Sequence, residues 1–179
     1  PPADGEADFV IAHPALGFLV LEVKGGIVGF DAVTGWYSIR QDNHQKVNIK
    51  NPVEQAKRSK YALRDKLRVQ PDLRGPVPAL GHAVAFPDGT VGTPQFGPDL
   101  PREIVLLHEH MVGLDGWIRR CMLFWAGLER SNPPGESGIG LLTRLLRKSW
   151  VLAAPGLATS LHQEQLEIAR YTIEQMRVL

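Results

Sequence analysis

The sequence predicts an α/β domain with a mixed central β-sheet flanked by helices. Short runs rich in Val, Ile, Leu and Phe occur at Phe9–Ala12 and Phe18–Val23 and indicate β-strands. Apolar residues at helical spacing occur at 52–68 and 114–128 and indicate amphipathic helices. Of the 179 residues, 44% are hydrophobic and 22% charged, an ordinary balance for a globular protein that leaves enough apolar material for one core.

The first two apolar runs are predicted to pair as a β-hairpin. Between them lies His13–Gly17, which contains the Pro and Gly typical of turns. Apolar side chains project to both faces of the second run, so it is predicted to be a central strand that is covered on both sides.

A second hairpin is expected from Trp36–Arg40 and Lys46–Lys50, with its turn at 41–44. The following helix should begin at Asn51-Pro52, because Asn caps helix N-termini and Pro suits the first helical position. It should end at Arg68.

The rest of the chain is predicted to contain two more strands, three more helices and a linker. The strands are Gly81–Phe86 and Ile104–Leu107, the helices are Leu114–Leu128, Leu141–Leu152 and Gln163–Val178, and the linker is Ser131–Gly140. The predicted domain organisation is therefore a domain at 1–130, a linker with a helix at 131–160, and a C-terminal helix at 161–179.

Ionisable groups interrupt the first two strands. If the hairpin turn centres on Ala15, Asp8 lies directly opposite Glu22, and opposed residues share one face of the sheet. Lys24 follows Glu22 by two positions and therefore points to the same face. A register shift of one residue would separate the three groups.

Two opposed carboxylates repel each other unless something neutralises them. A divalent cation does so, and Mg²⁺ or Mn²⁺ prefers the oxygen ligands that Asp8 and Glu22 offer, with the Val23 carbonyl as a further ligand. Lys24 beside such a cation would assist phosphodiester chemistry. The alternative is that Lys24 simply pairs with Glu22 or Asp8 at a strand end, which the spacing predicts equally well.

The stretches GEADFV, GFLVLEVKGG and NPVEQA together resemble the nuclease-related domain (NERD) of the PD-(D/E)XK nuclease superfamily, over about residues 5–125. That superfamily is marked by an Asp on one strand and Glu-x-Lys on the next, here Asp8 and Glu22-Val23-Lys24. The resemblance implies a restriction-endonuclease-like fold. It also implies a helical Gln near the active site, which would be Gln55, and Glu6 is a candidate additional acid.

The function implied by this resemblance is Mg²⁺-dependent (or Mn²⁺-dependent) hydrolysis of DNA phosphodiester bonds. Asp8 and Glu22 would hold the metal, Lys24 would assist the nucleophile, and Gln55 would position the nucleophile or the phosphate. The alternative is a catalytically inactive nuclease fold that serves as a DNA-binding or docking module of a helicase.

The last twenty residues, Ser160–Leu179, resemble the segment just upstream of the ATP-binding loop in superfamily 1 helicases. In that resemblance Gln165 corresponds to the adenine-contacting Gln. This implies a helicase domain in cis, outside this chain, and a role in DNA processing or repair. An ordinary amphipathic surface helix is the alternative.

Charge is unevenly distributed along the chain. Residues 1–31 carry five acids and one lysine, a net −4, whereas residues 46–74 carry nine bases and three acids, a net +6. A basic surface beside an acidic pocket suits an enzyme that acts on a polyanion. The residues expected to grip a DNA backbone are Lys57, Arg58, Lys60 and Arg64.

Other features carry weaker signals. His108-Glu109-His110 would place two histidines on one face of a strand, but a catalytic zinc site needs a third ligand. Trp36-Tyr37 is a candidate base-stacking pair. No apolar run is long enough for a membrane span, and the single cysteine excludes an internal disulfide, so a cytoplasmic protein without membrane contact is expected.

Overall fold

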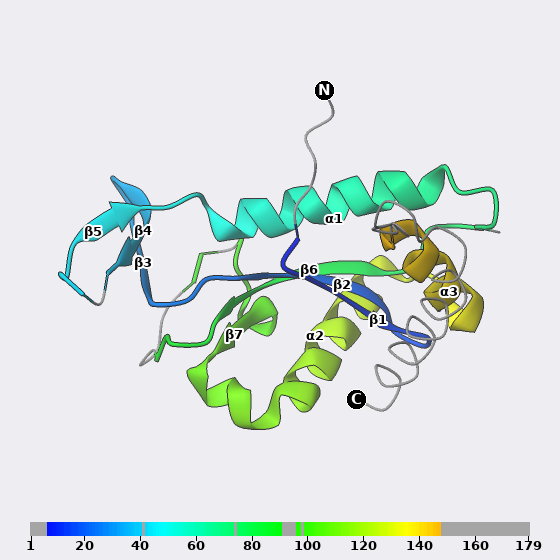
Figure 1. Cartoon of the computed structure of the whole chain (residues 1–179). Coiled ribbons are helices and arrows are strands. Elements are labelled where there is room, and N and C mark those ends of the chain that lie inside the picture. Colours follow the sequence, from blue (N-terminus) through cyan, green and yellow to red (C-terminus); the bar gives the residue numbers. More distant parts are fainter. Residues whose placement is uncertain (1–6, 41, 74, 91–95, 98, 148–179) are drawn as a thin grey trace, which may run out of the picture. The chain divides into compact units, whose positions relative to one another are not determined.

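The computed structural model describes residues 7–40, 42–73, 75–90, 96–97 and 99–147 (Figure 1). The chain divides into two compact units, Pro1–Leu146 and Arg147–Leu179. The predicted helix Gln163–Val178 and the segment that resembles a helicase lie outside the described residues.

A four-stranded mixed sheet forms the centre of the first unit. Its strands are β1 (Phe9–His13), β2 (Gly17–Val23), β6 (Leu80–Phe86) and β7 (Val105–Leu107), in the order β1-β2-β6-β7. β1 runs antiparallel to β2, whereas β2, β6 and β7 run parallel to one another. The predicted hairpin, the central position of the second strand and the mixed sheet are confirmed.

Helices cover both faces of this sheet. In Figure 1, α1 (Pro52–Arg68) lies along one face and α2 (Leu114–Glu129) along the other. The Asn51 side chain accepts hydrogen bonds from two backbone N–H groups of the first turn of α1, and this capping explains why the helix begins where the sequence predicts. No helix in the described part of the chain is both long and apolar enough to span a bilayer.

A second, smaller sheet consists of β3 (Ile27–Asp31), β4 (Gly35–Ile39) and β5 (Lys46–Asn48), all antiparallel. The predicted hairpin corresponds to β4 and β5, but β3 was missed. Its end is fixed by Asp31 Oδ1, which accepts hydrogen bonds from Val33 N, Thr34 N and Thr34 Oγ1. The Trp36 ring stacks on Phe86 of β6 with centroids 5.9 Å apart.

The predicted linker Ser131–Gly140 is wrong in its second half, because α3 extends from Gly135 to Leu146. Two contacts explain the early start. Gly135 N donates a hydrogen bond to Pro14 O in the β1–β2 turn, and Leu141 and Leu142 pack in one buried cluster with Phe18. Tertiary burial therefore outweighs the low helix propensity of three glycines.

Two short 3₁₀ helices flank β7, at Arg102–Ile104 and His108–Gly113. The strand predicted at Ile104–Leu107 is therefore observed as β7, which begins one residue later, at Val105. The helix predicted at Leu114–Leu128 is confirmed with one further residue.

Candidate active site and nucleic-acid surface

The hairpin register places Asp8 at the end of the ladder, beside the Glu22-Val23-Lys24 segment. The last paired residues are Phe9 and Leu21, and Asp8 is the next residue beyond them. Asp8 Oδ2 accepts a hydrogen bond of 2.7 Å from Val23 N. Asp8 therefore turns toward the Glu22-Val23-Lys24 segment and is anchored to its backbone.

Glu22 and Lys24 form an ion pair at the end of β2. Lys24 Nζ lies 2.6 Å from Glu22 Oε1, and only 5% of the Glu22 side chain is exposed. A buried carboxylate requires such a partner, because removing its charge from water is costly. Both interpretations of the motif, active site and structural ion pair, predict this contact.

Gln55 lies on the helix that covers the Glu22 face of the sheet. α1 packs against β2, where its Leu63 and Leu67 share a buried cluster with Val20. Val20 and Glu22 are two apart on one strand and therefore face the same side. The Oε1 atom of Gln55 is buried without a hydrogen-bond partner among the described residues. An orphaned buried acceptor of this kind calls for an explanation.

The donor atoms at this strand end fit a divalent cation. Asp8 and Glu22 supply carboxylate oxygens, the ligands that Mg²⁺ and Mn²⁺ prefer. The N–H and C=O of one strand residue point to the same side, so the Val23 carbonyl faces the Asp8 side. Among the described residues, no group of three or more His, Cys, Asp and Glu side chains is placed to hold a metal. Water and substrate oxygens would complete the coordination, and Glu6 lies outside the described residues.

The glycines that follow Lys24 are held by a carboxylate that the sequence analysis missed. Asp88, in the turn after β6, accepts a hydrogen bond of 2.7 Å from Gly26 N through Oδ2. Parallel strands β2 and β6 end at the same edge, which is why residues 62 positions apart meet here. Pro87-Asp88-Gly89 is a sequence typical of turns, but the contact between Asp88 and Gly26 depends on the order of the strands in the sheet.

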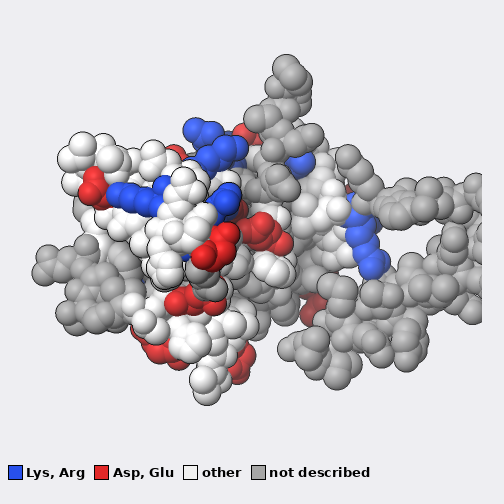
Figure 2. Space-filling model, turned by 60° about the vertical axis from the view of Figure 1, so that its left-hand side comes forward, with Lys and Arg blue, Asp and Glu red and all other residues white. Residues whose placement is uncertain are grey.

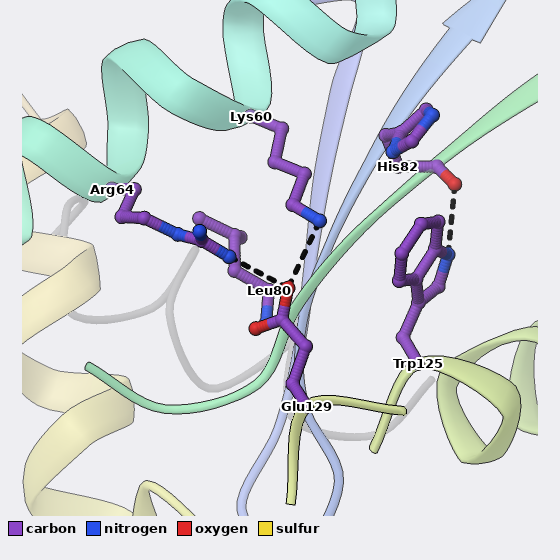
Figure 3. A network of polar contacts seen from close by, with 6 residues as sticks. All are labelled: Lys60, Arg64, Leu80, His82, Trp125 and Glu129. Atoms are coloured by element: carbon purple, nitrogen blue, oxygen red, sulfur yellow. Dashed lines mark hydrogen bonds and ion pairs between the residues drawn. The ribbon is translucent and has the colours of Figure 1, made fainter. Parts of the chain in front are cut away.

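Lys60 and Arg64 of α1 face inward, toward a second acidic residue. Figure 3 shows both side chains converging on Glu129 of α2, with Lys60 Nζ at 3.0 Å and Arg64 Nη2 at 2.6 Å from Oε1. Lys60 is buried, and its Nζ also lies 4.1 Å from the centroid of the Trp125 ring. Burial lowers the pKa of Lys60 below its ordinary value even though Glu129 opposes this.

The same α2 side chains protect an edge of the sheet. β7 pairs only with Val84–Phe86, so the first half of β6 has no described strand on that side. Glu129 Oε2 accepts from Leu80 N at 3.2 Å, and Trp125 Nε1 donates to His82 O at 2.9 Å (Figure 3). Side chains thereby satisfy backbone groups that would otherwise be open to strand pairing.

Two further titratable groups in this network, besides Lys60, have displaced pKa values. Burial lowers the pKa of His82 to about 4, with Lys60 and Lys57 adding to the effect. Burial alone raises the pKa of Glu129, but Lys60, the Leu80 N–H and Arg64 together hold it below its ordinary value. His82 Nδ1 is buried without a partner among the described residues.

These positions correct part of the predicted DNA surface. Lys60 is buried and paired with Glu129, so it does not present its charge to a DNA backbone, and one Arg64 nitrogen is engaged as well. Arg58 is exposed. Lys57 is partly exposed, and its Nζ lies 3.5 Å from Glu54 Oε1. Figure 2 brings the β3–β5 end forward and shows Lys and Arg side chains gathered above a patch of Asp and Glu.

The contacts of the two histidines and of the Trp36-Tyr37 pair show what these weaker candidates do in the structure. His108 and His110 lie in a 3₁₀ helix rather than a strand. His108 Nδ1 contacts Pro87 O, and His110 Nδ1 accepts from Leu107 N, so both serve local structure. Trp36 packs inward on Phe86, whereas Lys46 Nζ lies 3.8 Å from the centroid of the Tyr37 ring.

Comparison with known proteins gives one finding for the region that contains this site. The family model of the nuclease-related domain, NERD, matches residues 1–87, just under half of the chain. Searches of curated proteins and of solved structures found no match. The matched region ends with β6 and includes Asp8, Glu22, Lys24 and Gln55. Residues 1–87 of this chain are thus similar to the nuclease-related domain.

Proposed function

We propose that this domain is a Mg²⁺- or Mn²⁺-dependent nuclease that hydrolyses DNA phosphodiester bonds. One observation supports the proposal above the others. The hairpin register brings Asp8 and Glu22-Val23-Lys24 together at one strand end, inside the region that matches a nuclease-related domain.

The proposed roles follow from the contacts of each side chain. Asp8, anchored by Val23 N, and Glu22 would hold the metal with the Val23 carbonyl. When bound, the metal would lower the pKa of a coordinated water and stabilise negative charge on the phosphate. Lys24 is held beside Glu22 and would place a positive charge next to the attacked phosphate.

Gln55 would accept a hydrogen bond from the attacking water. Its buried Oε1 is an acceptor without a described partner, on the helix that covers the Glu22 face. Lys57 and Arg58, one turn further along α1, would contact the DNA backbone without reading its sequence. We extend the proposal to DNA processing or repair together with a helicase domain in cis, on the resemblance of Ser160–Leu179 alone.

A second candidate is a nuclease fold that binds DNA or a helicase without catalysis. The observation that favours it is the 2.6 Å contact between Lys24 Nζ and Glu22 Oε1, since a carboxylate oxygen occupied by a lysine is one that a metal must share. The two candidates differ in one measurable property, which is specific binding of a divalent cation.

Plasmid degradation by the full chain with Mg²⁺ or Mn²⁺ tests the proposal, with wild type compared against Lys24→Ala. Activity should fall by about 100-fold or more in the variant, because a charge next to the reacting phosphate is lost. Lys66→Ala, an exposed lysine near the other end of α1, is the matched control and should retain full activity. Equal activity in wild type and Lys24→Ala would refute the roles assigned here. Mn²⁺ calorimetry that shows no binding would favour the non-catalytic candidate.

A further inference from the structure

An open cavity of about 670 Å³ lies at the C-terminal end of α1. Its wall is formed by Arg64, Arg68, Leu73, Gly75, Pro76, Val77, Glu129, Arg130, Ser131 and Asn132. These residues come from the end of α1, the segment before β6, and the end of α2.

The cavity lies away from the Glu22 site. α1 has 17 residues and therefore spans about 25 Å. Phe18, near the start of β2, packs in one cluster with Leu63 and Leu67 near the last turns of α1, and Glu22 lies four residues, about 13 Å, further along β2. The Glu22 site and the cavity therefore lie at opposite ends of the helix.

Positive charge dominates the wall of the cavity. Three arginines face one acid, Glu129, whose carboxylate is already contacted by Lys60, Arg64 and Leu80 N. α1 and α2 both end here, and their C-terminal carbonyls supply about half a negative charge each. Even with Glu129, with Asp65 beside Arg68 and with both helix ends counted, the three arginines and Lys60 leave a net charge of about +1.

The arginines differ in how far they are engaged by other groups. Arg64 donates to Glu129, and Arg68 lies 3.9 Å from Asp65 with 63% of its side chain exposed. No hydrogen bond or ion pair to another described residue engages the Arg130 guanidinium. Two guanidinium groups are thus available to an anion, and their planar donor pairs match phosphate oxygens.

Other residues of the cavity wall restrict the kind of anion that the cavity can bind. The Ser131 Oγ atom is buried without a partner in the described part of the chain, so it has a hydrogen bond to offer. Leu73, Pro76 and Val77 form an apolar side. A ligand that satisfies both parts carries a phosphate beside a less polar body such as a sugar and base.

We propose that this cavity binds the phosphate of a nucleotide, through Arg68, Arg130 and Ser131, at a site separate from Glu22. The nucleotide is either free or part of a nucleic-acid strand, since both present the same phosphate and sugar. The proposal is independent of catalysis at Glu22, because none of the cavity residues belongs to that site.

The test measures binding of dTMP, of pyrophosphate and of a short oligothymidylate to the full chain in the absence of divalent cations. The test variant is Arg68→Gln/Arg130→Gln. The control variant is Arg119→Gln/Arg120→Gln, which removes the same charge from exposed positions on α2 outside the cavity. We expect the test variant to weaken binding by about tenfold or more and the control by less than about twofold, with unchanged circular dichroism for both.

Preference among the probes distinguishes the two sources of the phosphate. Tighter binding of dTMP than of the oligothymidylate, per nucleotide, indicates a free nucleotide, and the reverse indicates a strand. Failure of all three probes to bind at millimolar concentration overturns the proposal, and so does an equal loss in the test and control variants. Glu22→Gln should bind dTMP and pyrophosphate as wild type does, so a failure of the nuclease proposal leaves this result intact.

Discussion

Two carboxylates, the buried Glu22 and the partly buried Glu129, lie near opposite ends of α1, and each is paired with a lysine, yet their surroundings differ. Glu129 accepts from Lys60, Arg64 and Leu80 N, so the charge and hydrogen-bonding capacity of its carboxylate are well used. Within the described part of the chain, Lys24 is the only hydrogen-bond partner of the Glu22 carboxylate, Asp8 is anchored to the neighbouring Val23 N, and Gln55 Oε1 has no partner. The carboxylate of Glu129 is thus satisfied by three protein donors, whereas that of Glu22 is contacted by one.

That difference separates a structural ion pair from a candidate site. A structural cluster gains by satisfying every polar atom, since an incomplete buried network is costly. An active site keeps donors and acceptors that only substrate, metal or water will use, and it accepts lower stability in return. The predictions below test whether the two clusters behave in these two ways.

The largest expected effect is on catalysis at Glu22. Glu22→Gln should lower the rate of plasmid degradation by about 1,000-fold and abolish Mn²⁺ binding in calorimetry, because a charged ligand oxygen is lost. Its thermal midpoint should change little, because Lys24 is partly exposed. Glu129→Gln, the matched change in the other cluster, should retain Mn²⁺ binding. Loss of Mn²⁺ binding in both variants would remove the distinction between the clusters.

The next largest effect is on stability, and it belongs to Glu129. Glu129→Gln should lower the free energy of unfolding by about 3–5 kcal/mol, because it leaves Lys60 buried without its counter-charge. Urea denaturation at neutral pH measures this. Glu54→Gln breaks an exposed pair with Lys57 and should cost no more than about 0.5 kcal/mol. Comparable losses for these two variants would show that the Lys60–Glu129 pair is no more than a surface contact.

The buried His82 predicts a dependence of stability on pH. Its pKa is about 4 in the folded protein and about 6.5 when unfolded, so the folded state binds fewer protons between these values. Stability should therefore be fully present above about pH 6.5 and fall by up to about 3 kcal/mol as the pH drops to about 4. Glu129, whose pKa is lowered, adds a further loss only at the acid end of this range.

Urea unfolding of His82→Leu across the same pH range checks the assignment. Above the pH range in which carboxylates titrate, the free energy of unfolding of this variant should depend only weakly on pH. His44→Asn, a change at an exposed turn residue, should keep the wild-type profile. An unchanged slope in His82→Leu would assign the acid sensitivity to other groups.

A smaller effect is expected at Gln55, with opposite signs for stability and activity. Gln55→Leu removes a buried acceptor that has no described partner, so the free energy of unfolding should rise by about 1 kcal/mol. Activity should fall by about tenfold, because the acceptor for the attacking water is lost. Destabilisation by Gln55→Leu would show that a protein group satisfies Oε1 and that Gln55 is structural.

The smallest effect concerns the exposed bases of α1. Arg58→Gln should reduce the slope of log affinity against log salt by about 1 in DNA binding, because one phosphate contact is lost. The matched variant Lys60→Gln should leave the slope unchanged, because Lys60 is buried against Glu129. Salt titrations of a fluorescent duplex measure both. If Lys60→Gln reduced the salt slope more than Arg58→Gln does, Lys60 would have to contact the DNA backbone.

Sequence patterns predicted the local elements where one strong signal acted alone. The Asn51-Pro52 cap placed the start of α1, and the turn at 13–17 set the hairpin register, which leaves Asp8 beside Val23 at the end of the ladder. β3 was missed because its five residues follow a Gly-Gly break and pair only with β4. The start of α3 was predicted six residues too late, because the glycines in its first turns have low helix propensity. Burial of Leu141 and Leu142 stabilises the helix in spite of them.

The sequence by itself determined the hairpin that brings Asp8 to the strand end of Glu22-Val23-Lys24, because a hairpin relates residues through a short turn and a fixed two-residue period. The packing of α1 on α2 decided the fate of Lys60 and Arg64, whose partner Glu129 is 65 or more positions away. A basic residue on a helix looks the same in sequence whether it meets solvent or a buried acid. Only the tertiary contacts, which set its dielectric surroundings and its counter-charge, tell the two apart.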